Sequence, residues 1–278
     1  MSDLTRINTN LQAISSLNAL QRTNSQLGIR QLRLATGSQI NRAEDDSAGY
    51  TIAKKLEARV RGQAKALQNI GDAKSMLTVG EGSLNSVMDI LQSMKEKTVQ
   101  AANDTMGATE RTAIKNELDA LSAEVAEILS DSTFNGTSLF SSVGTSFTYQ
   151  VNAENGDTFV AAIATIGATG ASGMSIATGD LDVTSAGSAG TSLAYIDSAI
   201  NTVSTRLASI GDSQKRLSFK QENLQTSMVN YEAARSRIED ADFAKEQMEI
   251  LKLQILQQTG TAALAQANTG PQSILQLF

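Results

Sequence analysis

The clearest pattern in the sequence is a long seam of apolar positions in its C-terminal third. Between residues 193 and 231, apolar residues and two glutamines recur at alternating steps of three and four. This spacing is sustained over more than five heptads and predicts a long helix of the coiled-coil type. The glutamines weaken the packing of such a seam but can fix its register. The seam consists of Leu193, Ile196, Ile200, Val203, Leu207, Ile210, Gln214, Leu217, Gln221, Leu224, Met228 and Tyr231.

Shorter runs with the same spacing predict further helices in the N-terminal half. Residues 51–100 and 109–130 are helical in pattern, and a single Pro in 278 residues suits long uninterrupted helices. Thr109 is expected to cap the second of these helices after a break at Gly107, with Glu110 in its first turn. The first helix is predicted from Leu4, Ile7, Leu11, Ile14, Leu17 and Leu20.

One segment in the middle of the chain predicts strands. Two β-rich runs, 147–151 and 158–163, flank Glu154-Asn155-Gly156-Asp157, and Asn-Gly between such runs indicates a hairpin. Residues 165–190 are low in complexity and leave loop, strand and partial disorder open. The expected fold is therefore mainly α, with long antiparallel coiled-coil-like helices and a small β-hairpin region.

The C-terminal tail combines apolar residues with a complete lack of charge. Residues 253–278 contain no Asp, Glu, Lys or Arg. Exposed on a monomer, such a tail would limit solubility, so we expect it to be buried on its own chain or between subunits. Its large apolar residues are Leu253, Ile255, Leu256, Leu264, Ile274, Leu275, Leu277 and Phe278.

Composition argues against most catalytic chemistry. The chain has no His and no Cys, which excludes Cys/His zinc sites, thiol nucleophiles and Ser-His-Asp triads. The acidic triplet Glu44-Asp45-Asp46 has no partner ligands nearby and is interpreted as a turn and helix N-terminus. We therefore expect no enzyme, no catalytic, metal or cofactor-binding residues, and no cofactor.

Charge and hydropathy argue against two kinds of binding partner, nucleic acid and the membrane interior. A net charge of −6 argues against nucleic acid. No stretch approaches about 18 consecutive apolar residues, so membrane insertion is not expected. Residues 1–20 contain no apolar core of a signal peptide, and we therefore expect export, if it occurs, without a cleaved signal peptide.

Blocks near the N-terminus resemble the bacterial flagellins. Ile7-Asn-Thr-Asn10 comes first, and residues 35–49, ATGSQINRAEDDSAG, are similar to the family pattern S-G-x-x-I-N-x-A-x-D-D-A-A-G. Thr36 stands in place of the pattern's Ser, and Ser47 in place of an Ala. Arg61-Gly62, Glu81-Gly82 and Phe134-Asn-Gly136 are also similar to the family.

Blocks near the C-terminus resemble the same family. They are Ala234-Arg-Ser-Arg-Ile-Glu-Asp-Ala-Asp242, Gln254-Ile-Leu256, Ala265-Gln-Ala-Asn268 and Pro271-Gln272. Together the two sets cover roughly residues 1–136 and 200–278. Several ordered blocks at both ends make the resemblance specific, although no single block would.

The resemblance implies an architecture and a function. Residues 1–40 and 242–278 would pair as the inner, filament-core helical domain, and residues 41–241 would form a helical bundle domain with a short β/loop insert at about 131–190. The resemblance implies a short form of the family with a minimal central region. The implied function is a structural subunit that polymerises into the extracellular flagellar filament for motility. A hook–filament junction protein or another coiled-coil scaffold is the alternative.

The resemblance also implies partners and contact residues. The partners are further copies of the chain, a flagellar export chaperone, the filament cap and the hook-junction proteins. The residues expected to pack between subunits are Leu4, Ile7, Leu11, Ile14, Leu251, Ile255, Leu264 and Leu275.

A further expectation concerns immune recognition. In many flagellins a segment Q-R-x-R-E-L-x-V-Q is read by the flagellin-sensing Toll-like receptor, and residues 92–100 here are QSMKEKTVQ. Ser93 replaces an Arg and Lys97 replaces a Leu, whereas Lys95 keeps the charge and Glu117 resembles the family's acid on the next helix. The two replacements predict weak recognition.

Overall fold

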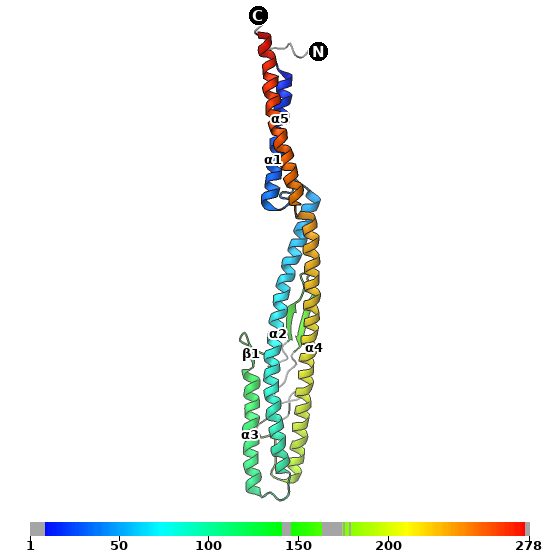
Figure 1. The fold of residues 1–278 in the computed structure, drawn as a ribbon. Helices are drawn as coiled ribbons and strands as arrows, with labels where there is room; N and C mark the ends of the chain where they lie inside the picture. Colours follow the sequence, from blue (N-terminus) through cyan, green and yellow to red (C-terminus); the bar gives the residue numbers. More distant parts are fainter. Residues whose placement is uncertain (1–8, 141–145, 163–173, 175, 178, 276–278) are drawn as a thin grey trace. The chain divides into compact units, whose positions relative to one another are not determined.

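The computed structural model describes residues 9–140, 146–162, 174, 176–177 and 179–275, which form five helices and four short strands (Figure 1). The chain divides into two compact units. Unit 1 combines residues up to 59 with those from 229 onward, and unit 2 comprises residues 60–228. The helices are α1 (Leu11–Thr36), α2 (Ser47–Ala101), α3 (Ala108–Asp131), α4 (Ala186–Glu239) and α5 (Phe243–Leu275).

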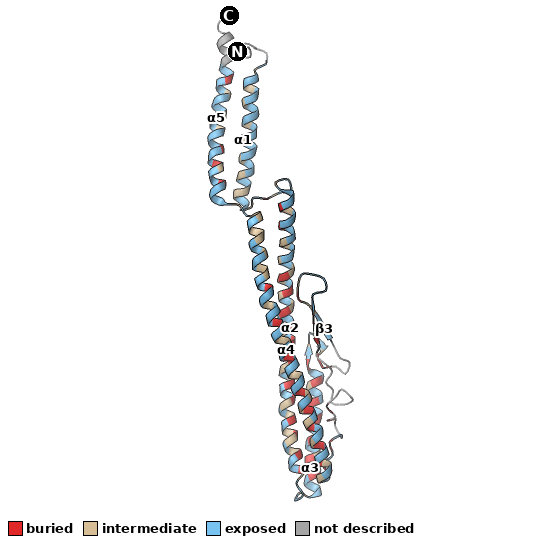
Figure 2. Cartoon of the chain, turned by 90° about the vertical axis from the view of Figure 1, so that its right-hand side faces the viewer, coloured by how far each residue is buried: buried red, intermediate tan, exposed pale blue. Residues whose placement is uncertain are grey.

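Unit 2 is built on α2, α3 and α4, which share a core; α3 and α4 both run antiparallel to α2. Gln63 of α2 donates to Ser227 of α4 at 3.1 Å, and near the other end of α2 the Lys95 ammonium lies 2.6 Å from Asp197. Buried residues gather where α2, α3 and α4 run alongside one another (Figure 2). Fully buried side chains include Ile70, Met76, Leu77, Leu84, Leu91, Met94 and Leu118.

The seam predicted between residues 193 and 231 is confirmed. All its positions lie on α4, and each is buried or half-buried. Both glutamines in the seam have partners on α2. Gln214 donates to the Glu81 carboxylate at 2.9 Å, and the Lys74 ammonium donates to the Gln221 side-chain oxygen at 3.4 Å. These contacts give both glutamine side chains a hydrogen-bond partner within an otherwise apolar interface.

The predicted cap of α3 is wrong in one detail. The helix begins at Ala108, so Thr109 is already inside its first turn, and the N-cap is Gly107 in an extended conformation with no side-chain hydrogen bond. Glu110 lies in the first turn as predicted. A Cβ added at Gly107 would lie only 2.4 Å from Glu110 Oε2, so the glutamate occupies the space beside this helix end.

The predicted hairpin forms as strands β3 (Ser146–Gln150) and β4 (Thr158–Ala162), paired antiparallel. Phe159 and Ala161 point into the core, while Val160 between them is half exposed. Arg216 of α4 lies 5.1 Å from the centre of the Phe159 ring. The hairpin therefore packs against the core of unit 2 with only one of its two faces.

A second hairpin joins β1 (Thr133–Phe134) to β2 (Thr137–Ser138). Its two-residue turn is Asn135-Gly136, and both residues have positive φ, 52° and 77°. This is the pattern of a type I′ turn. The hairpin was not expected from the sequence, because strands of two residues carry no periodic signal.

Part of the low-complexity insert packs into unit 2. Met174, Ile176, Leu181 and Val183 are buried, and the Ser122 hydroxyl of α3 donates to the Ile176 carbonyl. From Ala186 onward the chain is helical. For residues 165–190 the sequence left loop, strand and partial disorder open. The described part of this segment is a packed loop followed by the start of α4, whereas residues 165–173, 175 and 178 lie outside the described residues.

Candidate assembly interface

Helices α1 and α5 lie side by side and antiparallel in unit 1 (Figures 1 and 2). Three polar contacts between the helices are spread along the length of the pair. The Asn10 amide donates to the Ala267 carbonyl at 2.7 Å, Gln257 donates to Asn24 at 2.8 Å, and Arg30 binds Glu246 at 2.7 Å. Helix α1 is capped by Asn10, whose side chain accepts from the Ala13 amide, and it ends at Gly37 with φ of 72°.

The face of α5 that meets α1 follows a heptad pattern of its own. Its positions are buried or half-buried at alternating steps of three and four. A Cβ added at Gly260 would lie 3.3 Å from Leu20 Cδ1, so the absence of a side chain there permits close approach. No residue of α1 is buried. The seam on α5 consists of Glu246, Ile250, Leu253, Gln257, Gly260, Leu264 and Ala267.

Large apolar side chains on the other faces of the pair are left open to solvent. On α1, Leu11 and Ile14 are 48% and 50% exposed, and on α5, Leu251 and Ile255 are 51% and 64% exposed. Two helices can cover only one face of each other, so the outward faces remain uncovered in a single chain. An apolar surface of this kind marks an interaction site. Other exposed members are Leu17, Ile29, Leu32, Phe243, Met248 and Leu256.

The eight residues expected to pack between subunits fall into three groups in the structure. Leu11, Ile14, Leu251 and Ile255 face outward, as an intersubunit contact requires. Leu264 is half-buried on the seam toward α1. Leu4 and Ile7 lie outside the described residues, as does the side chain of Leu275 at the end of α5. Their role in subunit packing stays a prediction.

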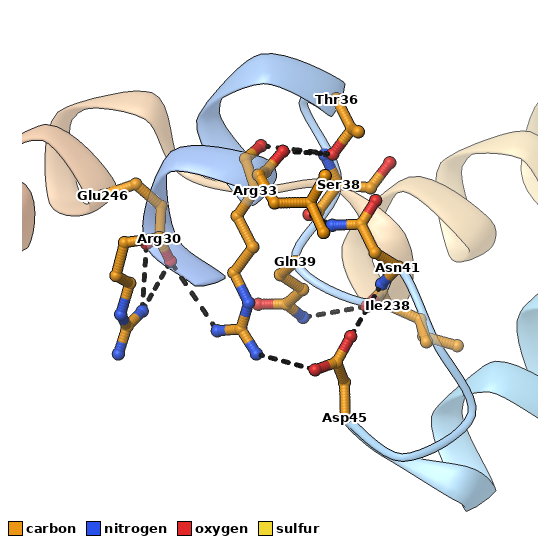
Figure 3. A network of polar contacts seen from close by, with 10 residues as sticks. Arg30, Arg33, Thr36, Ser38, Gln39, Asn41, Asp45, Ile238 and Glu246 are labelled. Atoms are coloured by element: carbon orange, nitrogen blue, oxygen red, sulfur yellow. Dashed lines mark hydrogen bonds and ion pairs between the residues drawn. The ribbon is translucent and has the colours of Figure 1, made fainter. Parts of the chain in front are cut away.

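At one end of the helix pair, a buried carboxylate is held by two arginines (Figure 3). The Glu246 side chain is 6% exposed, and both its oxygens accept from Arg30 Nη1, at 2.7 and 3.0 Å. Arg33 Nη1 lies 3.9 Å from the same carboxylate, and Arg33 Nη2 lies 3.8 Å from Asp45. Arg33 therefore connects α1, α5 and the loop between α1 and α2.

The loop after α1 is fixed by backbone contacts to the junction between α4 and α5. The Gln39 amide donates to the Glu239 carbonyl at 2.7 Å, and the Ala241 amide donates to the Gly37 carbonyl at 2.8 Å. The Gln39 side chain adds a bond to the Ile238 carbonyl at 2.8 Å, drawn in Figure 3. The end of α1 and the start of α5 are thereby held to the same junction.

The acidic triplet has the structural role expected of it. Asp45 accepts from the backbone amides of Arg42 and Asn41, each at 3.0 Å. These hydrogen bonds, together with the nearby Arg33 charge, hold the pKa of Asp45 below its ordinary value. Asp46 accepts from the Gly49 amide at 3.0 Å in the first turn of α2. A Cβ at Gly49 would lie 2.4 Å from Asp46 Oδ2 and 2.8 Å from Ile40 Cδ1, so a larger residue here would displace these side chains.

The segment similar to the receptor-binding stretch lies on α2 in unit 2, and its lysines are paired within the chain. Lys95 contacts Asp197, as described above, and Lys97 Nζ lies 2.8 Å from Glu117 Oε1 on α3. Ser93 is half-buried beside them. Lys97 and Glu117 therefore already satisfy each other's charge in the isolated chain.

Neither a metal centre nor a membrane span is found in the part of the chain that the structure describes. No group of three or more His, Cys, Asp or Glu side chains there is arranged to hold a metal ion. Likewise, none of the described helices is both long and apolar enough to cross a bilayer. The feature that stands out is the uncovered apolar surface of α1 and α5.

Comparison with protein families covers most of the chain. Residues 7–145 match the bacterial flagellin N-terminal helical region, and residues 193–278 match the bacterial flagellin C-terminal helical region. The first region contains α1 to α3 and the second most of α4 with α5. The segment between them, 146–192, holds the β3–β4 hairpin and the packed loop.

Individual proteins agree with the family match. The flagellin of Bacillus subtilis (strain 168) is 36% identical, over 98% of this chain and 99% of its own length. Flagellin FlaB1 of Treponema pallidum (strain Nichols) is 34% identical over the same shares. A solved structure from Vibrio parahaemolyticus, described as flagellar hook-associated, has a TM-score of 0.59 at 17% identity and covers 70% of this chain and 100% of its own. That likeness shows a shared fold alone.

The structure and the comparisons point to the same family. The structure pairs the two terminal helices and leaves apolar faces uncovered, and the two family matches cover the same terminal regions. Relatives above 30% identity cover nearly the whole chain, and the region between the terminal helical regions is short. The chain belongs to the bacterial flagellin family, whose members are the extracellular subunits of the flagellar filament used in motility.

Proposed function

We propose that copies of this chain contact one another in the filament through the outward faces of α1 and α5. The observation that carries the proposal is the exposed apolar surface on this pair, represented by Leu11, Ile14, Leu251 and Ile255. The uncharged tail supports it, because residues 253–278 carry no side chain that would resist burial between subunits.

The energetics of the helix pair favour assembly. Helix α1 buries no residue in the single chain, and an isolated pair of this kind is marginal because most helix stability comes from tertiary packing. Full burial of each Leu or Ile side chain contributes about 1.5–3 kcal/mol. Several such side chains per subunit offset the ordering cost. The same reasoning supports residues 1–40 and 242–278 as the inner filament-core domain.

Placing a charge on the outward face tests this surface. We expect Ile255→Lys to raise the protein concentration needed for polymerisation about tenfold or more, because the ammonium must be desolvated and the apolar burial is lost. The concentration is measured by sedimentation and the polymers are inspected by electron microscopy. Ile255→Leu is the control and should assemble like the parent chain. Polymerisation of Ile255→Lys at the parent concentration would refute the proposal.

We further infer that the partners implied by the flagellin resemblance contact this chain outside the filament shaft. They are an export chaperone before assembly, and the filament cap and hook-junction proteins at the two ends of the filament. Membership of the family supports them. The outward faces of α1 and α5 are the surface that needs cover before assembly.

A second proposal concerns the receptor-like segment on α2. We propose that this chain is a weak ligand of the flagellin-sensing Toll-like receptor. Lys97 is held 2.8 Å from Glu117, so recognition would have to separate an existing ion pair, and Ser93 lacks the guanidinium fork of an Arg.

The receptor proposal predicts a gain of activity. Ser93→Arg combined with Lys97→Leu should strengthen receptor stimulation by about an order of magnitude, since each restored contact is of hot-spot type. Monomeric protein is applied to receptor-bearing cells and the half-maximal dose is measured. Gln68→Arg, at an exposed position of the same helix, is the control for added charge. Equal potency of the parent chain and the double variant would contradict the proposal.

A further inference from the structure

We propose that Met248 on α5 is a site of reversible oxidation that controls assembly. The inference rests on the proposed function, because this thioether lies on the outward face of α5 that we assign to contacts between subunits. Its support comes from the exposure of Met248 and from the small number of oxidisable side chains in the sequence.

Methionine is the side chain through which a mild peroxide acts on this protein. The sequence contains no Cys, no Trp and no His, whereas it contains eight Met. Peroxides convert methionine to methionine sulfoxide, and the exposure of each sulfur decides how readily it reacts. Any effect of peroxide on assembly should therefore be traceable to a particular methionine.

The structure singles out one methionine by its exposure. Met248 is 65% exposed, and it is the exposed methionine among those that the structure describes. Met76 shows the contrast, because it has no exposed surface and its sulfur accepts a hydrogen bond from the Tyr149 hydroxyl at 3.0 Å. Met1 lies outside the described residues. The other methionines are buried or half-buried: Met88, Met94, Met106, Met174 and Met228.

Met248 belongs to the outward face of α5. It precedes Leu251 by three residues and Ile255 by seven, so the three side chains lie on one side of the helix. The buried Glu246 and Ile250 lie on the opposite side, toward α1. Access to the Met248 sulfur therefore does not depend on α1, whereas a second subunit seated on this face would cover it.

The reaction transfers one oxygen atom to the Met248 sulfur. The O–O bond of the peroxide breaks, an S=O bond forms, the sulfur is oxidised by two electrons, and hydrogen peroxide leaves as water. Two thiols reverse the step: they are oxidised to a disulfide, and the sulfoxide oxygen leaves as water. The oxidised side chain is polar, whereas the thioether is apolar.

The sulfoxide opposes burial between subunits. Its oxygen is hydrated on the free chain but would have to leave water in the assembled filament. Leu251 and Ile255 beside it are apolar and offer no hydrogen-bond donor from their side chains. Oxidation therefore favours the free subunit, and reduction restores the surface that assembles.

Peroxide treatment of the full-length monomer tests access to the site. We expect Met248 to be oxidised about tenfold faster than the buried Met76, because the oxidant reaches its sulfur directly. In preformed filaments Met248 should react about tenfold more slowly than in the monomer, because a neighbouring subunit covers it. Mass spectrometry of proteolytic peptides measures both rates.

Polymerisation of the oxidised chain tests the consequence. We expect oxidation to raise the protein concentration needed for polymerisation about tenfold, and the two methionine sulfoxide reductases with a dithiol to lower it again. Met248→Leu removes the sulfur and should keep assembly after the same treatment. Met228→Leu, at a half-buried position of α4, is the matched control and should lose assembly like the parent chain. Met248→Gln carries a permanent amide at the site and should assemble poorly without peroxide.

Assembly at the parent concentration by a chain fully oxidised at Met248 would overturn the inference. An equal loss of assembly in peroxide-treated Met248→Leu would also overturn it, as would equal oxidation rates of Met248 in monomer and filament. Met248→Ile takes the place of Met248→Leu if the latter assembles poorly before treatment.

The variant Ile255→Lys separates this inference from the proposed function, because it tests the assembly surface without an oxidant. A block by Ile255→Lys together with normal assembly of the oxidised chain would refute the role of Met248 alone. Normal assembly of Ile255→Lys would refute the surface itself.

Discussion

Deletion of residues 242–278 is expected to abolish filament formation while leaving unit 2 folded. The deletion removes α5, and with it Glu246 and the outward-facing Leu251 and Ile255. Helix α1 then has no partner, and a lone helix with no buried residue is marginal in water. Electron microscopy and sedimentation should find no polymer at concentrations at which the full chain assembles.

The survival of unit 2 follows from the location of its core. Its main cluster of buried apolar side chains runs from Ala66 to Leu224, entirely within residues 60–228. Circular dichroism of the deletion variant should therefore retain a cooperative thermal transition close to that of unit 2 in the full chain. Filaments formed by the deletion variant would contradict the assembly surface, and loss of the transition would contradict the independence of unit 2.

The helices of unit 2 were predictable because their burial is periodic. In α4, positions such as Ile196, Val203 and Leu217 are fully buried, and they repeat at the spacing that brings one face of a helix against a partner. Sequence alone therefore located the buried face of a helix 54 residues long. The β3–β4 hairpin was predictable for a different reason, since turn residues separate two β-rich runs.

The outward and inward faces of α5 could not be separated from the sequence. Between Leu253 and Ala267 every side chain is uncharged, so charge does not distinguish the two faces. The face toward α1 even contains Gln257 and Gly260, whereas Ile255 points outward. Only the contacts with α1 show which apolar residues of α5 are already covered in the single chain. They place Leu264 on the inner seam.

The Arg30–Glu246 contact was missed because its partners are 216 residues apart and neither residue belongs to a recognisable motif. A charge within an apolar repeat is the signal that could have found it. Glu246 stands four residues before Ile250 and seven before Leu253, which places its side chain on the seam. A carboxylate at such a position needs a buried partner.

Leu84→Ala is expected to lower the free energy of unfolding of unit 2 by about 2–5 kcal/mol, the usual cost of a cavity at a well-packed leucine. Leu84 lies on α2 with no exposed surface, and it belongs to the main core cluster. Val79, on the same helix, is 41% exposed, and Val79→Ala should change the free energy by about 0.5 kcal/mol or less. Urea denaturation of the monomers, followed by circular dichroism, measures both. Because the two substitutions remove side-chain carbon from one helix and differ chiefly in burial, equal costs would contradict the packing of α2 in this core.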